Sequence, residues 1–392
     1  MRETVRLFKN DLNARFVERP NRFLIIAESD GKKLACHCPN PGRMAECLFP
    51  GVELILEKRT WSADASKHGK NVVRKTAWIA AAIRYKGNIA PLYAFRTNIV
   101  VRELILKKII PELRDVYPEF SMGGSRFDFL CIDQKGRRHL VEVKACSLVE
   151  YGTAMFPDAP SERALRHLEK LDRLSQEGFI CHALFVILHG EPKVFIPNLH
   201  TDPAFASALY RFGSGNRPSV AVHGALIHCG DDGEAELVST SVKIDLRHGQ
   251  LAGMNSGNYL VLLELPLGRE IEAGALGPIY FKKGWYVYSG SARKNLSTRL
   301  GRHMRKIKKR KHWHLDYITP YAEKIEGFPI ASYRNLECDL AASLQKIGGE
   351  VIPGFGSSDC GCGGHFFYFP GQPFLDPAFR DLFFYYRHER FS

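Results

Sequence analysis

The chain of 392 residues is long enough for two or three domains, and its hydrophobic content of 45% allows sizeable cores. No apolar run approaches the ~20 residues of a membrane-spanning helix, and the N-terminal residues lack a signal-peptide core, so we expect a cytoplasmic protein with no membrane partner. Ten cysteines in this length do not make a disulfide scaffold, and a net charge of +13 favours a polyanionic partner, nucleic acid first.

Residues 1–97 contain short β-like runs separated by turn residues. The runs lie at residues 23–28, 33–36, 52–56, 76–83 and 89–93. Closely spaced strands with little helix predict a small barrel such as an OB-fold. Basic residues, among them Arg43, are interspersed with aromatic residues, which is typical of a platform for single-stranded nucleic acid. The same aromatic side chains could equally pack inside the barrel.

Residues 98–108 predict a helix that ends before Pro111 and carries Glu103 among apolar side chains. Glu103 is either a member of a carboxylate cluster or an exposed charge. The stretch from Ser125 to Lys144 then predicts two strands joined by a polar turn.

Charged residues on this hairpin suggest a metal site. Side chains two apart in a strand share a face, so Glu142 and Lys144 should point the same way. If the strands pair in register, Asp128 lies beside them. Two carboxylates and an ammonium suit a divalent metal that activates water next to a phosphate. A solvated hairpin face is the alternative.

A helix is predicted from Ser161, its N-cap, to Gly178. Arg163, Arg166 and His167 lie off its apolar stripe, where they can meet phosphates or solvent. Residues 179–188 are almost entirely apolar, which predicts a strand buried on both faces. A further strand at 193–197 and a short helix at 202–209 follow.

The order of acid, Asp and Glu-x-Lys on a helix and hairpin resembles the PD-(D/E)xK nuclease fold. Five motifs narrow the resemblance to the sugar fermentation stimulation protein A (SfsA) family over residues 1–248. They are His37-Cys-Pro-Asn-x-Gly-Arg-Met44, Ser125-Arg-x-Asp-Phe129, Val141-Glu-Val-Lys144, Phe156-Pro-Asp-Ala159 and Arg166-His-Leu168. Two positions depart from the family's motifs, because Pro41 and Ala164 stand where we expect Thr and Gly.

This resemblance implies an OB-like nucleic-acid-binding barrel at 1–97, a PD-(D/E)xK domain at 98–248 and DNA binding. It implies that Glu103, Asp128, Glu142 and Lys144 form the catalytic set, with Asp128 and Glu142 holding Mg²⁺ or Mn²⁺. We also expect nucleic-acid contacts from four basic side chains. These are Arg43, Arg126, Arg163 and His167.

Residues 249–256, rich in glycine and polar side chains, predict a linker. Strands at 259–265 and 284–290 and a helix from about Lys294 resemble the GIY-YIG nuclease fold over residues 257–392. The resemblance implies that Tyr259 and Tyr288 are motif tyrosines, Arg299 stabilises the phosphorane charge, His303 assists proton transfer and Glu337 binds a metal.

Two further clusters follow. Arg302, Arg305 and Lys308 belong to a basic run that is either a solvated patch or a phosphate-binding surface, and we favour the latter. Cys338, Cys360, Cys362 and His365 could form a zinc site. The segment around Cys360 also fits a tight turn before the strand 366–369, which we favour.

The sequence thus predicts a multidomain α+β protein with an OB-like β-barrel, a PD-(D/E)xK α/β core and a C-terminal GIY-YIG-like α/β module. We expect a Mg²⁺-dependent nuclease acting on DNA, or on RNA. The alternative is a non-cleaving DNA-binding regulator with degenerate nuclease folds. A nucleotide-binding module ranks last because no glycine-rich phosphate loop is present.

Overall fold

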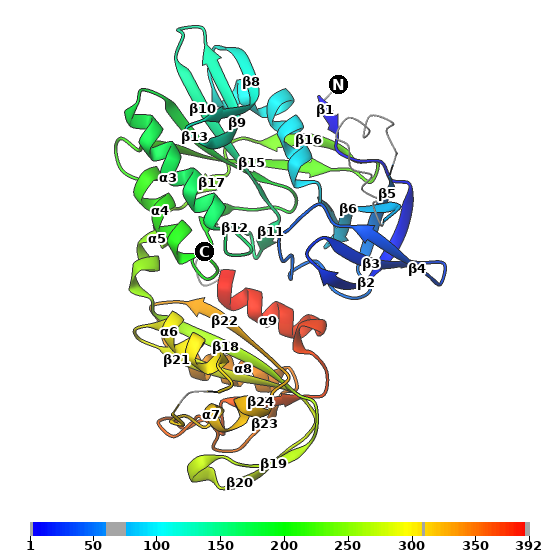
Figure 1. The fold of residues 1–392 in the computed structure, drawn as a ribbon, viewed down its shortest axis with the longest axis vertical. Helices are drawn as coiled ribbons and strands as arrows, with labels where there is room; N and C mark the ends of the chain where they lie inside the picture. Colours follow the sequence, from blue (N-terminus) through cyan, green and yellow to red (C-terminus); the bar gives the residue numbers. More distant parts are fainter. Residues whose placement is uncertain (1–2, 60–75, 308–309, 389–392) are drawn as a thin grey trace. The chain divides into compact units, whose positions relative to one another are not determined.

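The computed structural model describes residues 3–59, 76–307 and 310–388 (Figure 1). The chain divides into two compact units, which we describe separately. The first unit comprises Met1–Asn198 and Ala204–Leu246, and the second comprises Leu199–Pro203 and Arg247–Ser392. Within the described ranges, no helix has both the length and the apolar character needed to cross a lipid bilayer.

The first unit begins with a β-barrel. Its strands are β2 (Leu12–Asn21), β3 (Leu24–Ser29), β4 (Lys32–His37), β5 (Glu53–Lys58), β6 (Trp78–Tyr85) and β7 (Asn88–Pro91). They are ordered β4-β3-β2-β5-β6-β7, and the parallel pairing of β4 with β6 closes the barrel. The strand β2 was not predicted, although its buried Ala14 and Phe16 alternate with exposed Asn13 and Arg15. Alternating burial of this kind marks a strand with one face on a core.

A seven-stranded sheet forms the centre of the first unit. Its order is β1 (Thr4–Arg6), β16 (Glu234–Ser239), β15 (Val220–Cys229), β13 (Ile180–Ile187), β10 (Arg138–Cys146), β9 (Ser125–Asp133) and β8 (Leu113–Met122). The strands β10, β13 and β15 run parallel. The predicted hairpin is therefore confirmed, and it lies next to the parallel strands.

The strand β13 is buried on both faces, as its continuous apolar sequence predicts. Leu184 and Val186 belong to one cluster of buried side chains, whereas Ala183 and Phe185 belong to another. The second cluster also contains Leu171 from α3 (Glu162–Gln176), which packs against the sheet (Figure 1). The sheet is thus the layer that separates two cores.

Helical and smaller β-elements complete the first unit. The segment predicted as a helix from 98 to 108 consists of α1 (Thr97–Val100), a π-helical turn (Val101–Ile105) and α2 (Leu106–Ile109). A four-stranded sheet pairs β11 (Leu148–Glu150), β12 (Thr153–Phe156), β14 (Val194–Pro197) and β17 (Lys243–Ile244). The helix predicted at 202–209 is α4 (Pro203–Gly213).

The second unit is built on a five-stranded antiparallel sheet. Its order is β22 (Lys324–Ala331), β18 (Gly257–Leu265), β21 (Gly284–Ala292), β24 (Phe366–Phe369) and β23 (Glu350–Val351). A hairpin pairs β19 (Arg269–Glu272) with β20 (Pro278–Phe281). The helices are α6 (Leu296–Met304), α7 (Leu315–Ile318), α8 (Glu337–Lys346) and α9 (Pro377–His388). In the predicted linker, α5 (His248–Leu251) and a 3₁₀ turn (Ala252–Met254) precede β18.

Candidate functional site

The β9–β10 hairpin brings three of the predicted catalytic residues together. Phe129 pairs with Val141, which sets Asp128 beside Glu142. Asp128 Oδ2 accepts a hydrogen bond of 2.7 Å from the backbone amide of Val143. Lys144 Nζ lies 2.5 Å from Glu142 Oε1. The strands therefore pair in the register that the predicted metal site requires.

Two further side chains hold the carboxylates in place. Asn98 Nδ2, on α1, donates a hydrogen bond of 2.7 Å to Asp128 Oδ1. His167 Nδ1, on α3, lies 2.5 Å from Glu142 Oε1. The structure corrects the expectation that His167 faces a phosphate, because its ring is buried against the Glu142 carboxylate. Sequence reasoning missed Asn98, whose only signal is its place at the start of a helix.

Burial and charge act differently on the two carboxyl groups. Burial, and after it the negative charge of Glu142, raises the pKa of Asp128. Burial alone would raise the pKa of Glu142 too, but the hydrogen bond with His167 and the charge of Lys144 hold it below its usual value. Among the described residues, Glu142 Oε2 is buried without a hydrogen-bond partner. A buried carboxylate oxygen without a partner is costly.

Glu103 does not join this cluster. Its side chain is 48% exposed and forms an ion pair with Arg102, with a distance of 2.7 Å. Asn98 rather than Glu103 contacts Asp128. The structure therefore favours the alternative that Glu103 is an exposed helix charge.

The carboxylate pair adjoins a cleft of about 910 Å³ in the first unit, lined by Asp128 and Lys144 among others. Basic side chains from the barrel, the helical segment and the core also line it. They are Arg22, Arg102, Arg126 and Arg163. Arg126 and Arg163 thus line the cleft, and their contact with nucleic acid stays a prediction. Arg43 is exposed but is not part of this lining.

Two of the sequence motifs interlock beside the cleft. The backbone amide of Met44, from the barrel, donates a hydrogen bond of 3.2 Å to Asp158 Oδ2. Burial raises the pKa of Asp158. A Cβ at position 42 would overlap Asp158 Oδ2, so any larger residue there would displace this carboxylate. The motif spacing therefore reflects a close approach between barrel and core.

A second cavity, of about 290 Å³, lies in the second unit and is lined by Tyr259, Tyr288, Arg299 and Glu337. Tyr259 Oη lies 3.0 Å from Nε2 of buried His303. The structure thus brings the five predicted residues of this module into one neighbourhood. Burial raises the pKa of both tyrosines, so both phenols are protonated at neutral pH.

Hydrogen bonds fix the polar groups of this cavity. Arg299 donates a bond of 2.7 Å to the Ser291 carbonyl. Glu337 Oε2 accepts a bond of 2.5 Å from Ser291 Oγ, and Glu337 Oε1 lies 3.1 Å from His365 Nδ1. Both carboxylate oxygens of Glu337 therefore already have protein partners.

The basic run has mixed roles. Arg302 bonds both oxygens of buried Asp316, at 3.0 and 2.8 Å, so its guanidinium stabilises the fold around α7 rather than standing free for a phosphate. Arg305 is exposed. Lys308 lies outside the described residues.

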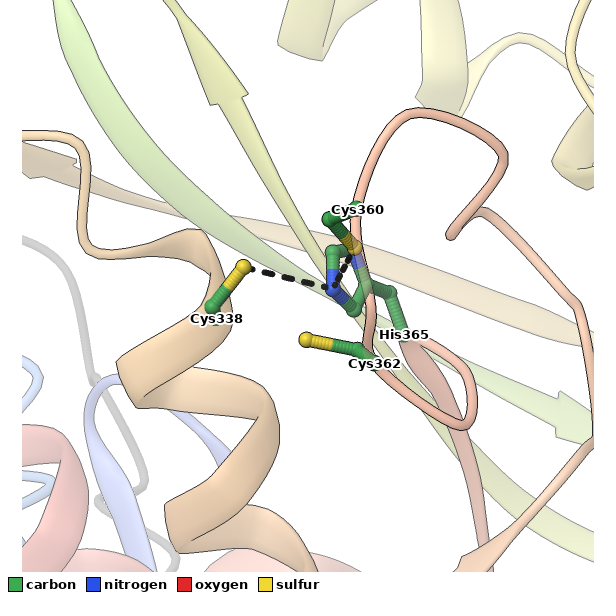
Figure 2. A group of neighbouring side chains, drawn as sticks. All are labelled: Cys338, Cys360, Cys362 and His365. Atoms are coloured by element: carbon green, nitrogen blue, oxygen red, sulfur yellow. Dashed lines mark hydrogen bonds between the residues drawn. The ribbon is translucent and has the colours of Figure 1, made fainter.

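The turn before β24 carries the cysteine and histidine residues that the sequence analysis noted. Ligand atoms of Cys338, Cys360, Cys362 and His365 all lie within 4.8 Å of one another (Figure 2). The tight turn that the sequence favoured is present, and it gathers a possible metal-ligand set. All ten cysteines, which fall within the described ranges, are free thiols.

Comparisons with known proteins agree with the first-unit motifs. The SfsA N-terminal OB domain model matches residues 17–91, and the sugar fermentation stimulation protein RE domain model matches residues 95–221. The sugar fermentation stimulation protein homolog of Methanothermobacter thermautotrophicus is 36% identical over 208 residues, 52% of this chain and 82% of that protein. The chain belongs to the SfsA family. The homolog of Moorella thermoacetica is 35% identical over 52% of this chain and 86% of its own length.

The SfsA fold also has a solved counterpart. The structure of Pyrococcus furiosus SfsA in complex with Ca²⁺ has a TM-score of 0.51 and 23% identity, and covers 62% of this chain and 99% of that one. This likeness supports the fold of the SfsA part. The model for the domain of unknown function DUF123 matches residues 258–384. An SfsA region is therefore joined to a second module in this chain.

Proposed function

We propose that the SfsA region is a divalent-metal-dependent nuclease of the PD-(D/E)xK type that hydrolyses phosphodiester bonds in DNA. The observation that carries the proposal is the buried Glu142 Oε2, which lacks a partner among the described residues, beside the carboxylate of Asp128 at a basic cleft. In this proposal the chain has the domains that the sequence predicts, which are an OB-like barrel at 1–97, a nuclease-like core at 98–248, a linker at 249–256 and a third domain at 257–392.

The donor set fits a hard cation. Mg²⁺, Mn²⁺ and Ca²⁺ prefer carboxylate oxygens, and the related Pyrococcus furiosus protein was solved with Ca²⁺. Asp128 and Glu142 would hold the ion, which would offset the repulsion between the two carboxylates. When bound, such an ion polarises a phosphate oxygen and lowers the pKa of an attached water.

The side chains of the chain supply positioning and charge. His167 and Asn98 fix one carboxylate each, so the oxygens need not reorganise when the ion binds. Lys144, next to Glu142, can orient the attacking water or contact the scissile phosphate. Arg126 and Arg163 can bind flanking phosphates and thereby set the register of the strand.

A second nuclease-like centre in the C-terminal module is favoured by one specific observation. Tyr259, Tyr288 and Arg299 line one cavity together with Glu337, and buried His303 contacts Tyr259. In this proposal Arg299 stabilises the charge on the phosphorane and His303 assists proton transfer. Because Glu337 is already bonded on both oxygens, any metal role for it requires one of those bonds to open.

The deciding experiment is a cleavage assay of the full chain with Mg²⁺ or Mn²⁺ on single-stranded, duplex and branched DNA and on RNA. Glu142→Gln should abolish cleavage while DNA binding persists, whereas Glu177→Gln, at the exposed end of α3, should change neither. Binding without cleavage on every substrate would instead support a regulator. Cleavage that survives Glu142→Gln but is lost in Arg299→Ala would assign the activity to the C-terminal module.

A further inference from the structure

The ligand atoms of four residues around the turn before β24 lie within 4.8 Å of one another, close to the spacing in a tetrahedral metal site. His365 Nε2 lies 3.5 Å from Cys360 Sγ and 3.9 Å from Cys338 Sγ. Ligands ~2.3 Å (sulfur) and ~2.0 Å (nitrogen) from a tetrahedral zinc stand roughly 3.5–3.8 Å apart. Figure 2 shows the side chain of Cys338 on its helix and those of Cys360, Cys362 and His365 on the opposite loop, converging on one point.

The outward side of His365 provides a second, independent observation. Its Nδ1 lies 3.1 Å from Glu337 Oε1, while its Nε2 faces the cysteine sulfurs. A carboxylate on the far nitrogen of a histidine is the usual outer partner of a histidine metal ligand, because it fixes the tautomer and the ring orientation. His365 is also buried, and its carbonyl accepts a hydrogen bond of 2.9 Å from the Ser289 amide on β21.

We propose that Cys338, Cys360, Cys362 and His365 bind one structural zinc ion, with Glu337 as the carboxylate that orients His365. Three thiolates and one imidazole are a soft donor set that closes all four positions of a tetrahedral ion. Cys338 is in the first turn of α8, where the helix dipole favours negative charge. This site is separate from the carboxylate pair of the SfsA region and does not depend on cleavage activity.

The zinc ion would connect three parts of the second unit. It joins the start of α8 to the turn at 360–362 and, through His365, to the strand β21. Gly356, Ser358 and Asp359, on the loop that leads into this turn, line the cavity together with Glu337. The ion therefore stabilises the loop that forms one side of the cavity lined by Tyr259 and Arg299. Glu337 belongs to this cavity and also contacts the zinc ligand His365.

The close approach of the loop is built into the sequence. A Cβ at position 364 would collide with the carbonyl oxygen of Ile352, so the chain can fold back just before His365 only with glycine there. The backbone amide of Gly354 stabilises this turn by donating a hydrogen bond of 2.8 Å to the Gly363 carbonyl. The turn thus presents Cys360, Cys362 and His365 together before any metal binds.

The test is to measure the metal content of the full chain twice, first after purification without added metal and again after exchange with Zn²⁺. We expect one zinc per chain and three thiols that resist alkylation until a strong chelator is added. Substitution with Co²⁺ should give the intense visible absorption of a tetrahedral thiolate site. Cys362→Ser should lose the zinc, whereas Cys229→Ser, a half-buried thiol on β15, should retain it.

A variant outside the ligand set tests the link to Glu337. Glu337→Gln should retain zinc but release it to a competing chelator about 10–100-fold more readily, and Glu350→Gln, whose carboxylate pairs with exposed Lys282, should not. Absence of stoichiometric zinc after exchange, iron in its place, a disulfide among the three cysteines, or a weak octahedral cobalt spectrum of the wild-type chain would each overturn the proposal. The cobalt and thiol measurements do not require a folded variant.

Discussion

His167 on α3 lies 2.5 Å from Glu142 on β10, between Nδ1 and Oε1. The contact connects α3 to the Glu142 carboxylate at the centre of the proposed nuclease site. It uses only one oxygen of Glu142, while Oε2 is left without a partner among the residues that the structure describes. In the proposed site, His167 therefore holds the Glu142 carboxylate in an orientation that leaves its Oε2 available to a metal ion.

Replacement of His167 by alanine should weaken binding of Mg²⁺ or Mn²⁺ and lower cleavage by about 10–100-fold, because Glu142 loses its orienting partner. Loss of a hydrogen bond to a charged group should also lower the free energy of unfolding by about 1–3 kcal/mol. Metal titration followed by calorimetry measures the first effect and urea denaturation the second. Arg166→Ala, an exposed neighbour that pairs only weakly with Glu162, is the control. Equal metal affinity in wild type and His167→Ala would contradict this role.

Asn98 and Glu103 offer a direct contrast between observed and predicted contacts. Asn98→Ala should reduce metal affinity, because Asp128 loses the donor that fixes its Oδ1. Glu103→Ala should leave metal affinity and cleavage within about twofold, since the side chain is exposed and pairs with Arg102. Both variants can be measured in the same calorimetric titration. A larger loss in Glu103→Ala than in Asn98→Ala would restore Glu103 to the catalytic set.

The β9–β10 hairpin could be predicted because the sequence features that define it lie within the hairpin itself. Period-two alternation fixes which side chains share a face, and the register then follows from the short turn. The continuous apolar run of β13 likewise predicted a strand buried on both faces. Both features need no knowledge of distant residues.

The partners of the hairpin were not predictable in this way. Asn98 contacts Asp128 on the hairpin, and Asn98 and Arg102 both line the cleft, whereas Glu103 does not line it. The apolar residues that flank the Arg102–Glu103 pair hide this difference in the sequence. Cys338 was named from the sequence as a candidate zinc ligand, but whether it meets Cys360 depends on where α8 packs, which their spacing in the sequence does not reveal.

The arginines of the cleft should determine how DNA affinity responds to salt. Arg126→Ala and Arg163→Ala remove side chains that line the cleft. Each should weaken DNA binding and reduce the slope of log affinity against log salt by about 1, the change expected for one phosphate contact. Arg173→Ala, an exposed residue further along α3 and outside the cleft lining, is the matched control. Fluorescence anisotropy at several salt concentrations measures the slope, and identical slopes in all three variants would contradict the assignment.

A row of three histidines crosses the parallel strands of the large sheet. His139 Nδ1 lies 3.0 Å from His182 Nε2, and His182 Nδ1 lies 3.0 Å from His223 Nε2. Asp133 stands at one end, 3.4 Å from His139 Nε2. Burial lowers the pKa of all three histidines, that of His182 to about 3. The row is therefore neutral in the folded protein near neutral pH.

These depressed pKa values predict acid sensitivity of the first unit. Between about pH 6.5 and pH 3 the unfolded chain binds protons that folded His182 does not, so stability rises with pH and falls as pH is lowered through this window. The slope should approach about 1.4 kcal/mol per pH unit for one such group. His182→Gln should flatten it, and His228→Gln, a histidine of β15 outside the row, should not. Urea denaturation of the first unit at several pH values, with chelator present, measures the slopes. If His182→Gln is as acid-sensitive as the wild type, the row does not carry the effect.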